Sequence, residues 1–206
     1  MNVTDDTSNG AAGPRTVGAI PRRQRADAIR NMARLLRAAE EVFSEEGLSA
    51  PVDDIAHRAG LGVGTVYRHF PTKEALVRAI VEARFEQAAR RAEELCEAGD
   101  PGEALGTFLG ELVELSYEKR DFSEELVRAG IDIESWKPEL MGHLREAFGL
   151  LLDKAQRSGA VRPDITVDDL DALGRGTCLA ACQCDCSAAR ARLVNVVVDG
   201  LRIRPS

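Results

Sequence analysis

The chain has 206 residues, of which 44% are hydrophobic and 30% are charged, a balance typical of a folded globular protein and not of a disordered chain. Aromatic residues make up only 4%, so the core must be built mainly from aliphatic side chains and alanine, which favours helices over strands. The net charge of −7 argues at first sight against a nucleic-acid partner. However, residues 15–78 carry 11 basic and 8 acidic side chains, whereas residues 79–206 carry 16 basic and 24 acidic ones, so a mild basic excess is confined to the N-terminal part.

No stretch of the sequence approaches the roughly 20 uninterrupted apolar residues of a membrane helix, and the first residues lack the apolar segment of a signal peptide. We therefore expect a cytoplasmic protein with no membrane partner. The five cysteines are an odd number, and four of them lie between residues 178 and 186. This distribution does not match the disulfide framework of a secreted domain, so we expect reduced thiols.

The first predicted element is a long amphipathic helix. Residues 1–20 are rich in Gly, Ser, Thr, Asn and Asp, which indicates a disordered tail. From residue 25 to residue 46 the apolar side chains recur at spacings of three and four, namely Ile29, Met32, Ala33, Leu36, Ala39, Val42 and Phe43. The pattern predicts a helix over residues 25–46 that ends at Gly47.

Two short helices and a second long one follow. Pro51 suits the first turn of a helix and Gly60 suits its end, so the second helix is expected between them. A third helix spans residues 64–70 and stops before the next proline. Thr72 is a natural N-cap for a fourth helix, which runs to about Cys96.

The second and third helices have the steric pattern of a helix-turn-helix. Ala56 is small enough for the two helices to approach closely, Gly60 can adopt the positive φ of a tight turn, and Val66 fills their shared core. The opposite face of the third helix then points outward, and it carries Val63, Gly64, Thr65, Tyr67, Arg68 and His69. The same spacing also fits a purely structural helix corner.

The rest of the chain shows only helical patterns. They occupy residues 101–119, 122–130, 137–158, 167–183 and 187–203. No segment alternates with period two for long enough to form a strand. The sequence therefore predicts an all-α protein of about nine helices, with a three-helix domain over residues 21–75 and a helical domain over residues 76–206.

A family resemblance rests on the motif around the third helix. The segment that begins at Val42 and includes GLGVGTVYRHFPTKEAL at residues 60–76 closely resembles the DNA-binding domain of TetR-family repressors. The motif is specific because it combines the turn glycine, Tyr-x-His-Phe and Pro-Thr-Lys at fixed spacing. The resemblance implies a transcriptional regulator, most simply a repressor that releases its operator when a small molecule binds. Activation is equally compatible with the sequence.

The resemblance also implies roles for individual residues. The third helix would enter the major groove with Val63, Gly64, Thr65 and Arg68 near base edges, and Arg68 is suited to pair with guanine. Tyr67, His69 and Lys73 match positions that hold phosphates. The basic residues ahead of the first helix are expected along the DNA backbone or in a minor groove, and they are Arg22, Arg23 and Arg25.

Two residues depart from the family pattern. Pro51 stands where many relatives carry a hydroxyl, and the third helix begins at Gly62 rather than at a serine. Both changes remove possible phosphate contacts while remaining acceptable at a helix start. We therefore expect a thinner set of DNA contacts than is typical of the family.

The C-terminal domain is expected to provide the dimer interface and an effector pocket. The resemblance places a homodimer interface on residues 167–183 and 187–203, and two-fold symmetry then predicts a palindromic operator in double-stranded DNA. The pocket is expected among residues 101–158, although each of its candidate lining residues also suits an ordinary core. They are Phe108, Leu112, Leu115, Tyr117, Phe122, Leu126, Trp136, Met141, Leu144, Phe148 and Leu151.

The cysteines leave an alternative open. Cys178, Cys182 and Cys186 recur every four residues with Cys184 close by, so they would suit a metal- or thiol-responsive sensor. Small buried thiols at a helix interface are the simpler interpretation. The sequence contains none of the common catalytic or nucleotide-binding motifs, and we expect neither an enzyme nor a cofactor. Effector binding is expected to act on DNA affinity by shifting the fourth helix.

Overall fold

The computed structural model describes residues 22–131, 135–136 and 140–203, without the side chains of residues 22–26 and 98. In this part of the chain the regular elements are nine α-helices, and the only β-type pairing is an isolated bridge between Val161 and Arg202. The expected all-α fold is confirmed. The helices are α1 (Arg22–Glu46), α2 (Val52–Ala59), α3 (Val63–His69), α4 (Lys73–Ala98), α5 (Pro101–Glu118), α6 (Arg120–Arg128), α8 (Gly142–Arg157), α9 (Val167–Ala181) and α10 (Ser187–Leu201).

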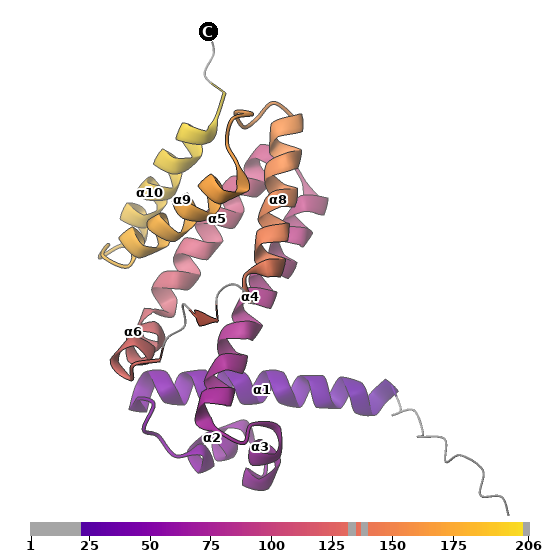
Figure 1. Cartoon of the computed structure of the whole chain (residues 1–206), viewed down its shortest axis with the longest axis vertical. Helices are drawn as coiled ribbons and strands as arrows, with labels where there is room; N and C mark the ends of the chain where they lie inside the picture. The colour runs from indigo at the N-terminus through magenta and orange to yellow at the C-terminus, as the bar shows by residue number, and fades with distance from the viewer. Residues whose placement is uncertain (1–21, 132–134, 137–139, 204–206) are drawn as a thin grey trace, which may run out of the picture.

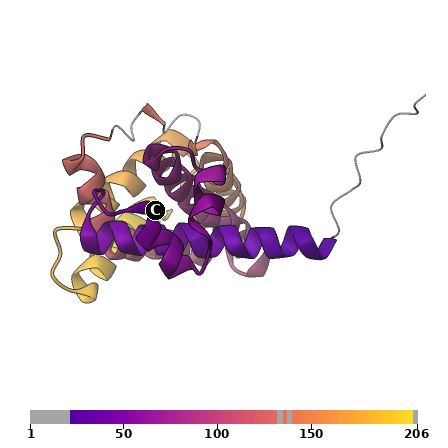
Figure 2. The ribbon, with the colours of Figure 1, turned by 90° about the horizontal axis from the view of Figure 1, so that it is seen from below.

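The molecule is elongated, with two groups of helices joined by α4. Figure 1 shows α1 lying across one end, with α2 and α3 beneath it and α4 rising from them into the upper bundle of α5, α8, α9 and α10. Seen from below, α1 extends well past the bundle on its N-terminal side (Figure 2). Ile29 on this projecting part is 70% exposed, so the N-terminal end of the predicted apolar stripe is not covered.

The lower core is built by α1, α2, α3, the first half of α4 and α6. Its largest fully buried side chains include Phe43, Ile55, Leu76 and Ile80. Phe122 and Leu126 of α6 belong to the same cluster, although α6 lies far from the first three helices in the sequence. The predicted helix-turn-helix is therefore packed on a core that includes an element from the second half of the chain.

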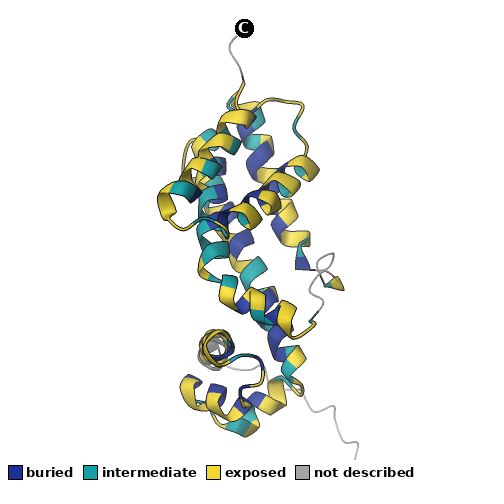
Figure 3. Ribbon diagram, turned by 90° about the vertical axis from the view of Figure 1, so that its left-hand side faces the viewer, coloured by how far each residue is buried: buried dark blue, intermediate teal, exposed yellow. Residues whose placement is uncertain are grey.

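The upper core is built by the second half of α4 together with α5, α8, α9 and α10. Phe108 of α5 and Phe148 of α8 meet edge to face, with ring centroids 5.1 Å apart and planes at 68°. Ala88, Ala89 and Ala92 let α4 pack closely against this cluster. Figure 3 shows buried residues running along the inner faces of the bundle, whereas the outer faces are largely exposed.

Most predicted helix boundaries agree with the structure to within about three residues. The first helix begins at Arg22 instead of residue 25, and α6 begins at Arg120 instead of residue 122. Only Lys119 separates α6 from α5. The pattern at 137–158 starts at Gly142 in the structure, with residues 137–139 outside the described part. The predicted tail, residues 1–20, also lies outside it.

Candidate nucleic-acid interface

The turn between α2 and α3 has the geometry that its glycine predicts. Gly60 caps α2 with φ 64° and ψ 37°, in the left-handed region, and its N–H donates to carbonyls of the last turn of α2. A Cβ atom there would lie 2.8 Å from Nη2 of Arg34, which donates to the Ala59 carbonyl at 2.5 Å. The positive φ favours glycine at position 60, and a side chain there would also displace the tip of Arg34.

One buried side chain fixes the orientation of α3. Val66 is fully buried against Ile55 and the rest of the lower core, with Leu61 and Phe70 packed at its edge, as the sequence predicts. Because α3 has only seven residues, this single anchor determines which face is buried. The remaining face is free to meet a ligand.

The exposed face of α3 carries hydrogen-bond donors. Gly64, Tyr67, Arg68 and His69 are exposed, with Tyr67 at 48%, whereas Val63 and Thr65 are half-buried. Within the described part of the chain, no ion pair or hydrogen bond engages the side chain of Arg68. The structure brings together six of the ten predicted contact residues on this one short helix, but Val63 packs partly on the core.

Lys73 is engaged inside the protein. Its ammonium donates to the carbonyls of Leu48 and Ala50, each at 2.7 Å, and lies 5.9 Å from the centre of the Phe43 ring. Lys73 is only half-exposed. The side chain predicted to hold a phosphate therefore ties the start of α4 to the turn that precedes α2.

The three N-terminal arginines lie in the first turn of α1 and not ahead of it, because the helix starts at Arg22. The side chains of Arg22, Arg23 and Arg25 fall outside the described part. Pro51 and Gly62 are the N-caps of α2 and α3, and neither provides a side-chain cap bond. The two departures noted in the sequence thus stand at the starts of α2 and α3.

A cluster of charges joins the lower core to the upper bundle. The Glu40 carboxylate of α1 accepts from Arg84 of α4 at 2.8 Å and from Lys119 at 2.7 Å. Burial opposes ionisation of Glu40, whose side chain is 13% exposed, but the two hydrogen bonds outweigh it and lower its pKa. The Arg84 guanidinium also covers the Phe122 ring at 4.4 Å.

Comparisons with known proteins agree with this architecture. Residues 35–80 match the model of bacterial regulatory proteins of the tetR family, and residues 100–203, about half of the chain, match that of the SbtR-like transcriptional regulator C-terminal domain. The chain belongs to the TetR family. A TetR regulator from Mycobacterium vanbaalenii is 41% identical with TM-score 0.69, the match covering 87% of this chain and 99% of that one.

Other TetR-family proteins align over similar lengths. A TetR regulator of Streptomyces coelicolor is 33% identical with TM-score 0.69, covering 84% of this chain and 99% of that one. The repressor KstR2 of Rhodococcus jostii is 31% identical over 144 residues, which are 65% of this chain and 69% of that protein. The chain is thus a DNA-binding transcriptional regulator of a family that does not consist of enzymes.

The residues predicted to line an effector pocket of this TetR-family chain are divided between the two cores. Phe108, Leu112, Met141 and Phe148 lie in or against the upper core, whereas Phe122 and Trp136 belong to the lower one. Tyr117 lies between the guanidinium groups of Arg190 and Arg120, at 3.7 and 4.5 Å from its ring centre. The structure therefore does not bring these seven side chains around one space.

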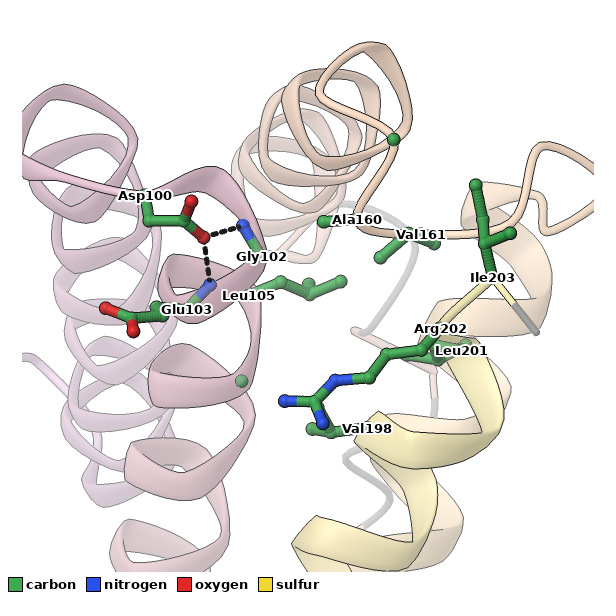
Figure 4. Close-up of a pocket in the computed structure, with 12 residues that line it drawn as sticks. Asp100, Gly102, Glu103, Leu105, Ala160, Val161, Val198, Leu201, Arg202 and Ile203 are labelled. Carbon is green, nitrogen blue, oxygen red and sulfur yellow. Dashed lines mark hydrogen bonds between the residues drawn. The ribbon is translucent and has the colours of Figure 1, made fainter. Parts of the chain in front are cut away.

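Two hollows of the upper bundle lie elsewhere. One, of about 270 Å³, lies between the start of α5, residues 159–161 and the end of α10, and Figure 4 shows Asp100 capping α5 on one wall, with Arg202 on the other. Asp100 is occupied by this cap, and Arg202 pairs with Asp199 at 3.0 Å. None of the predicted pocket residues lines it.

The second hollow is an apolar groove of about 590 Å³ on the outer face of α9 and α10. It is lined mainly by small and aliphatic side chains, including Ala172, Leu173, Gly176, Leu193 and Val196. Val196 is 72% exposed. Both helices were predicted to form a subunit interface, and the groove lies on their uncovered side.

The cysteines do not form a metal site. The thiols of Cys178 and Cys182 donate to the α5 carbonyls of Leu112 and Ser116, and Cys184 donates to the Ala180 carbonyl, all at 3.7 Å. Burial raises the pKa of Cys178 and Cys182. Among the residues that the structure describes, no group of three or more metal-ligating side chains converges. The alternative of a metal- or thiol-responsive sensor is not supported.

Proposed function

We propose that the chain is a ligand-responsive repressor whose α3 reads the major groove of operator DNA. The observation that carries the proposal is the face of α3, where Tyr67, Arg68 and His69 are exposed while Val66 holds the opposite side in the core. Arg68 suits a bidentate contact to guanine, and Tyr67 and His69 suit phosphates. KstR2 of Rhodococcus jostii is a transcriptional repressor, which supports repression over activation.

The DNA contacts can be tested with a duplex selected from a random-sequence library by the wild-type protein. Arg68→Ala should weaken binding to the selected duplex by about 1–3 kcal/mol and relax the choice of base at one position of each half-site. Tyr67→Phe removes one phosphate donor and should weaken all sequences alike. Unchanged affinity and base preference in both variants would refute the placement of α3.

We propose that two copies pair through the groove on α9 and α10. Large aliphatic side chains that line this groove are open to water, including Leu173 and Val196, and an exposed apolar patch of this kind is typical of a protein interface. Val196→Asp should shift the protein to monomer in light scattering, whereas Leu150→Asp, at a 50% exposed position on α8, should not. Two-fold pairing would place a second α3 about one DNA turn away.

Effector control is proposed to act through α4, which contributes to both cores. Val77 and Ile80 pack in the lower core and Ala89 and Ala92 in the upper one. A small molecule that favours one position of α4 would change the separation of the two α3 helices, and a coupling of about 1–3 kcal/mol lowers operator affinity about 5–150-fold. Screening compounds for release of the selected duplex tests this proposal.

The site of action is proposed to be the cytoplasm, where a bacterial regulator meets its DNA. None of the helices in the described part of the chain is long and apolar enough to cross a bilayer.

A further inference from the structure

The backbone of Leu48, in the turn between α1 and α2, is held from two sides. Its N–H donates to Oε1 of Glu125 on α6 at 3.0 Å, and its carbonyl accepts from Nζ of Lys73 on α4 at 2.7 Å. Lys73 also reaches the carbonyl of Ala50 at 2.7 Å. Two helices that are distant in sequence thus satisfy the polar groups of one buried turn, which we name the Leu48 clamp: Leu48, Ala50, Lys73 and Glu125.

The turn is shaped to admit the carboxylate of Glu125. Gly47 has φ 80°, and a Cβ atom there would lie 2.8 Å from Oε1 of Glu125. Leu48 and Ala50 are buried, and the Glu125 side chain is only 16% exposed. A carboxylate brought this close to a buried N–H forms a charge-assisted hydrogen bond, which is among the stronger bonds a turn can receive.

The position of the clamp makes it relevant to DNA binding. The turn leads through Pro51 into α2, and Lys73 is the first residue of α4, which begins shortly after the end of α3 at His69. Lys73 therefore joins the entrance of the helix-turn-helix to its exit, with α3 lying between these two points. Two of the three donors of its ammonium are used for this purpose.

We propose that Lys73 and Glu125 are positioning residues that set the placement of α3 against the duplex, with Lys73 acting through the turn and not as a phosphate ligand. The inference rests on the proposed function of α3. With Glu125 in this role, α6, an element of the C-terminal half, becomes part of the DNA-binding unit. A displacement of α6 would then reach the turn through Glu125 without passing along α4.

Salt dependence distinguishes positioning from phosphate contact. Each phosphate contact contributes about −0.9 to the slope of log K against log salt on duplex DNA. In fluorescence titrations of the full-length protein with the selected duplex, Lys73→Met should weaken binding at least about tenfold at every salt concentration and leave the slope unchanged. A slope that becomes less steep by about 0.9 per subunit would overturn the proposal, because this change identifies a lost phosphate contact.

The Glu125 arm uses a matched set of variants. Glu125→Ala leaves the Leu48 N–H without its partner and should weaken binding about threefold to tenfold. Glu125→Gln keeps an oxygen that can accept from this N–H and should restore most of the affinity. Arg128→Ala removes the exposed ion-pair partner of Glu125 and should bind as the wild type does. Equal loss in Glu125→Ala and Arg128→Ala, or no loss in either, would contradict the proposal.

Stability is measured alongside binding. Thermal unfolding identifies a temperature at which every variant is folded, and DNA affinities are compared only at that temperature. A residue that only stabilises the fold would then leave the DNA affinity unchanged. Should Lys73→Met not fold, the contrast between Glu125→Ala and Glu125→Gln decides. If the wild type selects no duplex at all, the proposed function fails. If it selects one and these variants bind it normally, only the present inference fails.

Discussion

The lower and upper groups of helices differ in what they leave exposed. In the lower group, α3 buries one aliphatic anchor, Val66, and presents Tyr67, Arg68 and His69 to solvent. In the upper group, α9 and α10 present aliphatic side chains such as Leu173 and Val196. Polar donors on a rigid short helix suit an anionic ligand, whereas an apolar face suits another protein surface. The two proposed roles, DNA binding and subunit pairing, therefore fall on different groups of helices.

The largest expected effect concerns Phe122, which α6 contributes to the lower core. Phe122→Ala should lower the free energy of unfolding by about 3–5 kcal/mol, since its ring is fully buried in the lower core. Phe148→Ala, in the upper core, should cost a similar amount in chemical unfolding. At a temperature where both variants are folded, only Phe122→Ala should weaken DNA binding. A loss of DNA binding in Phe148→Ala but not in Phe122→Ala would contradict this expectation.

The charge cluster between the two regions should make stability depend on pH. Glu40 has a pKa below its ordinary value of 4.5, so its carboxylate stabilises the fold above that pH and the contribution is lost as the pH falls through the lowered pKa. Glu40→Gln should cost about 1.5–3 kcal/mol at pH 7, and the difference from the wild type should vanish in acid.

Urea unfolding at a series of pH values measures this difference. Glu46→Gln is the control, because Glu46 is an exposed residue of the same helix whose contact with Arg58 is 3.8 Å long. It should change stability by less than about 0.5 kcal/mol at any pH. A pH-independent loss in Glu40→Gln would contradict the assigned role of the carboxylate.

Two glycines of the DNA-binding motif should respond in opposite directions. Gly60→Ala forces a Cβ into the left-handed region against Arg34 and should cost about 1–2 kcal/mol. Gly64→Ala meets open space in the first turn of α3 and should stabilise the fold by up to about 1 kcal/mol. Thermal unfolding of both variants measures the difference. Equal effects would show that the turn does not need its positive φ.

The smallest effect concerns the cysteines. Cys186 is exposed, and Cys186→Ser should change stability by less than about 0.5 kcal/mol. DNA binding by Cys186→Ser and by the wild type should be equal before and after treatment with peroxide. A loss of binding that occurs on oxidation only when Cys186 is present would restore the thiol-sensing alternative.

The helix-turn-helix could be predicted from sequence because its special positions have steric causes. Gly60 needs a positive φ, Val66 must be buried, and Pro51 and Thr72 mark helix starts, so the residue types themselves carry the geometry. Helix ends are harder to predict from the sequence where no capping residue marks them. Lys119, for example, serves as the boundary of both α5 and α6.

The placement of the residues expected around an effector pocket could not be predicted in the same way. Phe108 and Phe122 are equally apolar and equally suited to a helix face, yet they lie in different cores. Only the tertiary packing of α6 onto α1 decides between them. The Leu48 clamp is also hidden from sequence, because Lys73 and Glu125 bind backbone atoms of the turn. The capping box of Thr166 and Asp169, in contrast, has a sequence spacing from which the start of α9 can be predicted.

Methylation interference at guanine N7 on the selected duplex shows whether paired copies of α3 occupy the major groove. We expect two clusters of interfering guanines, related by the two-fold axis and separated by a whole number of DNA turns of about 10 base pairs each, and loss of one guanine per cluster with Arg68→Ala. Tight binding with no interference in the major groove, or with a single cluster, would contradict it.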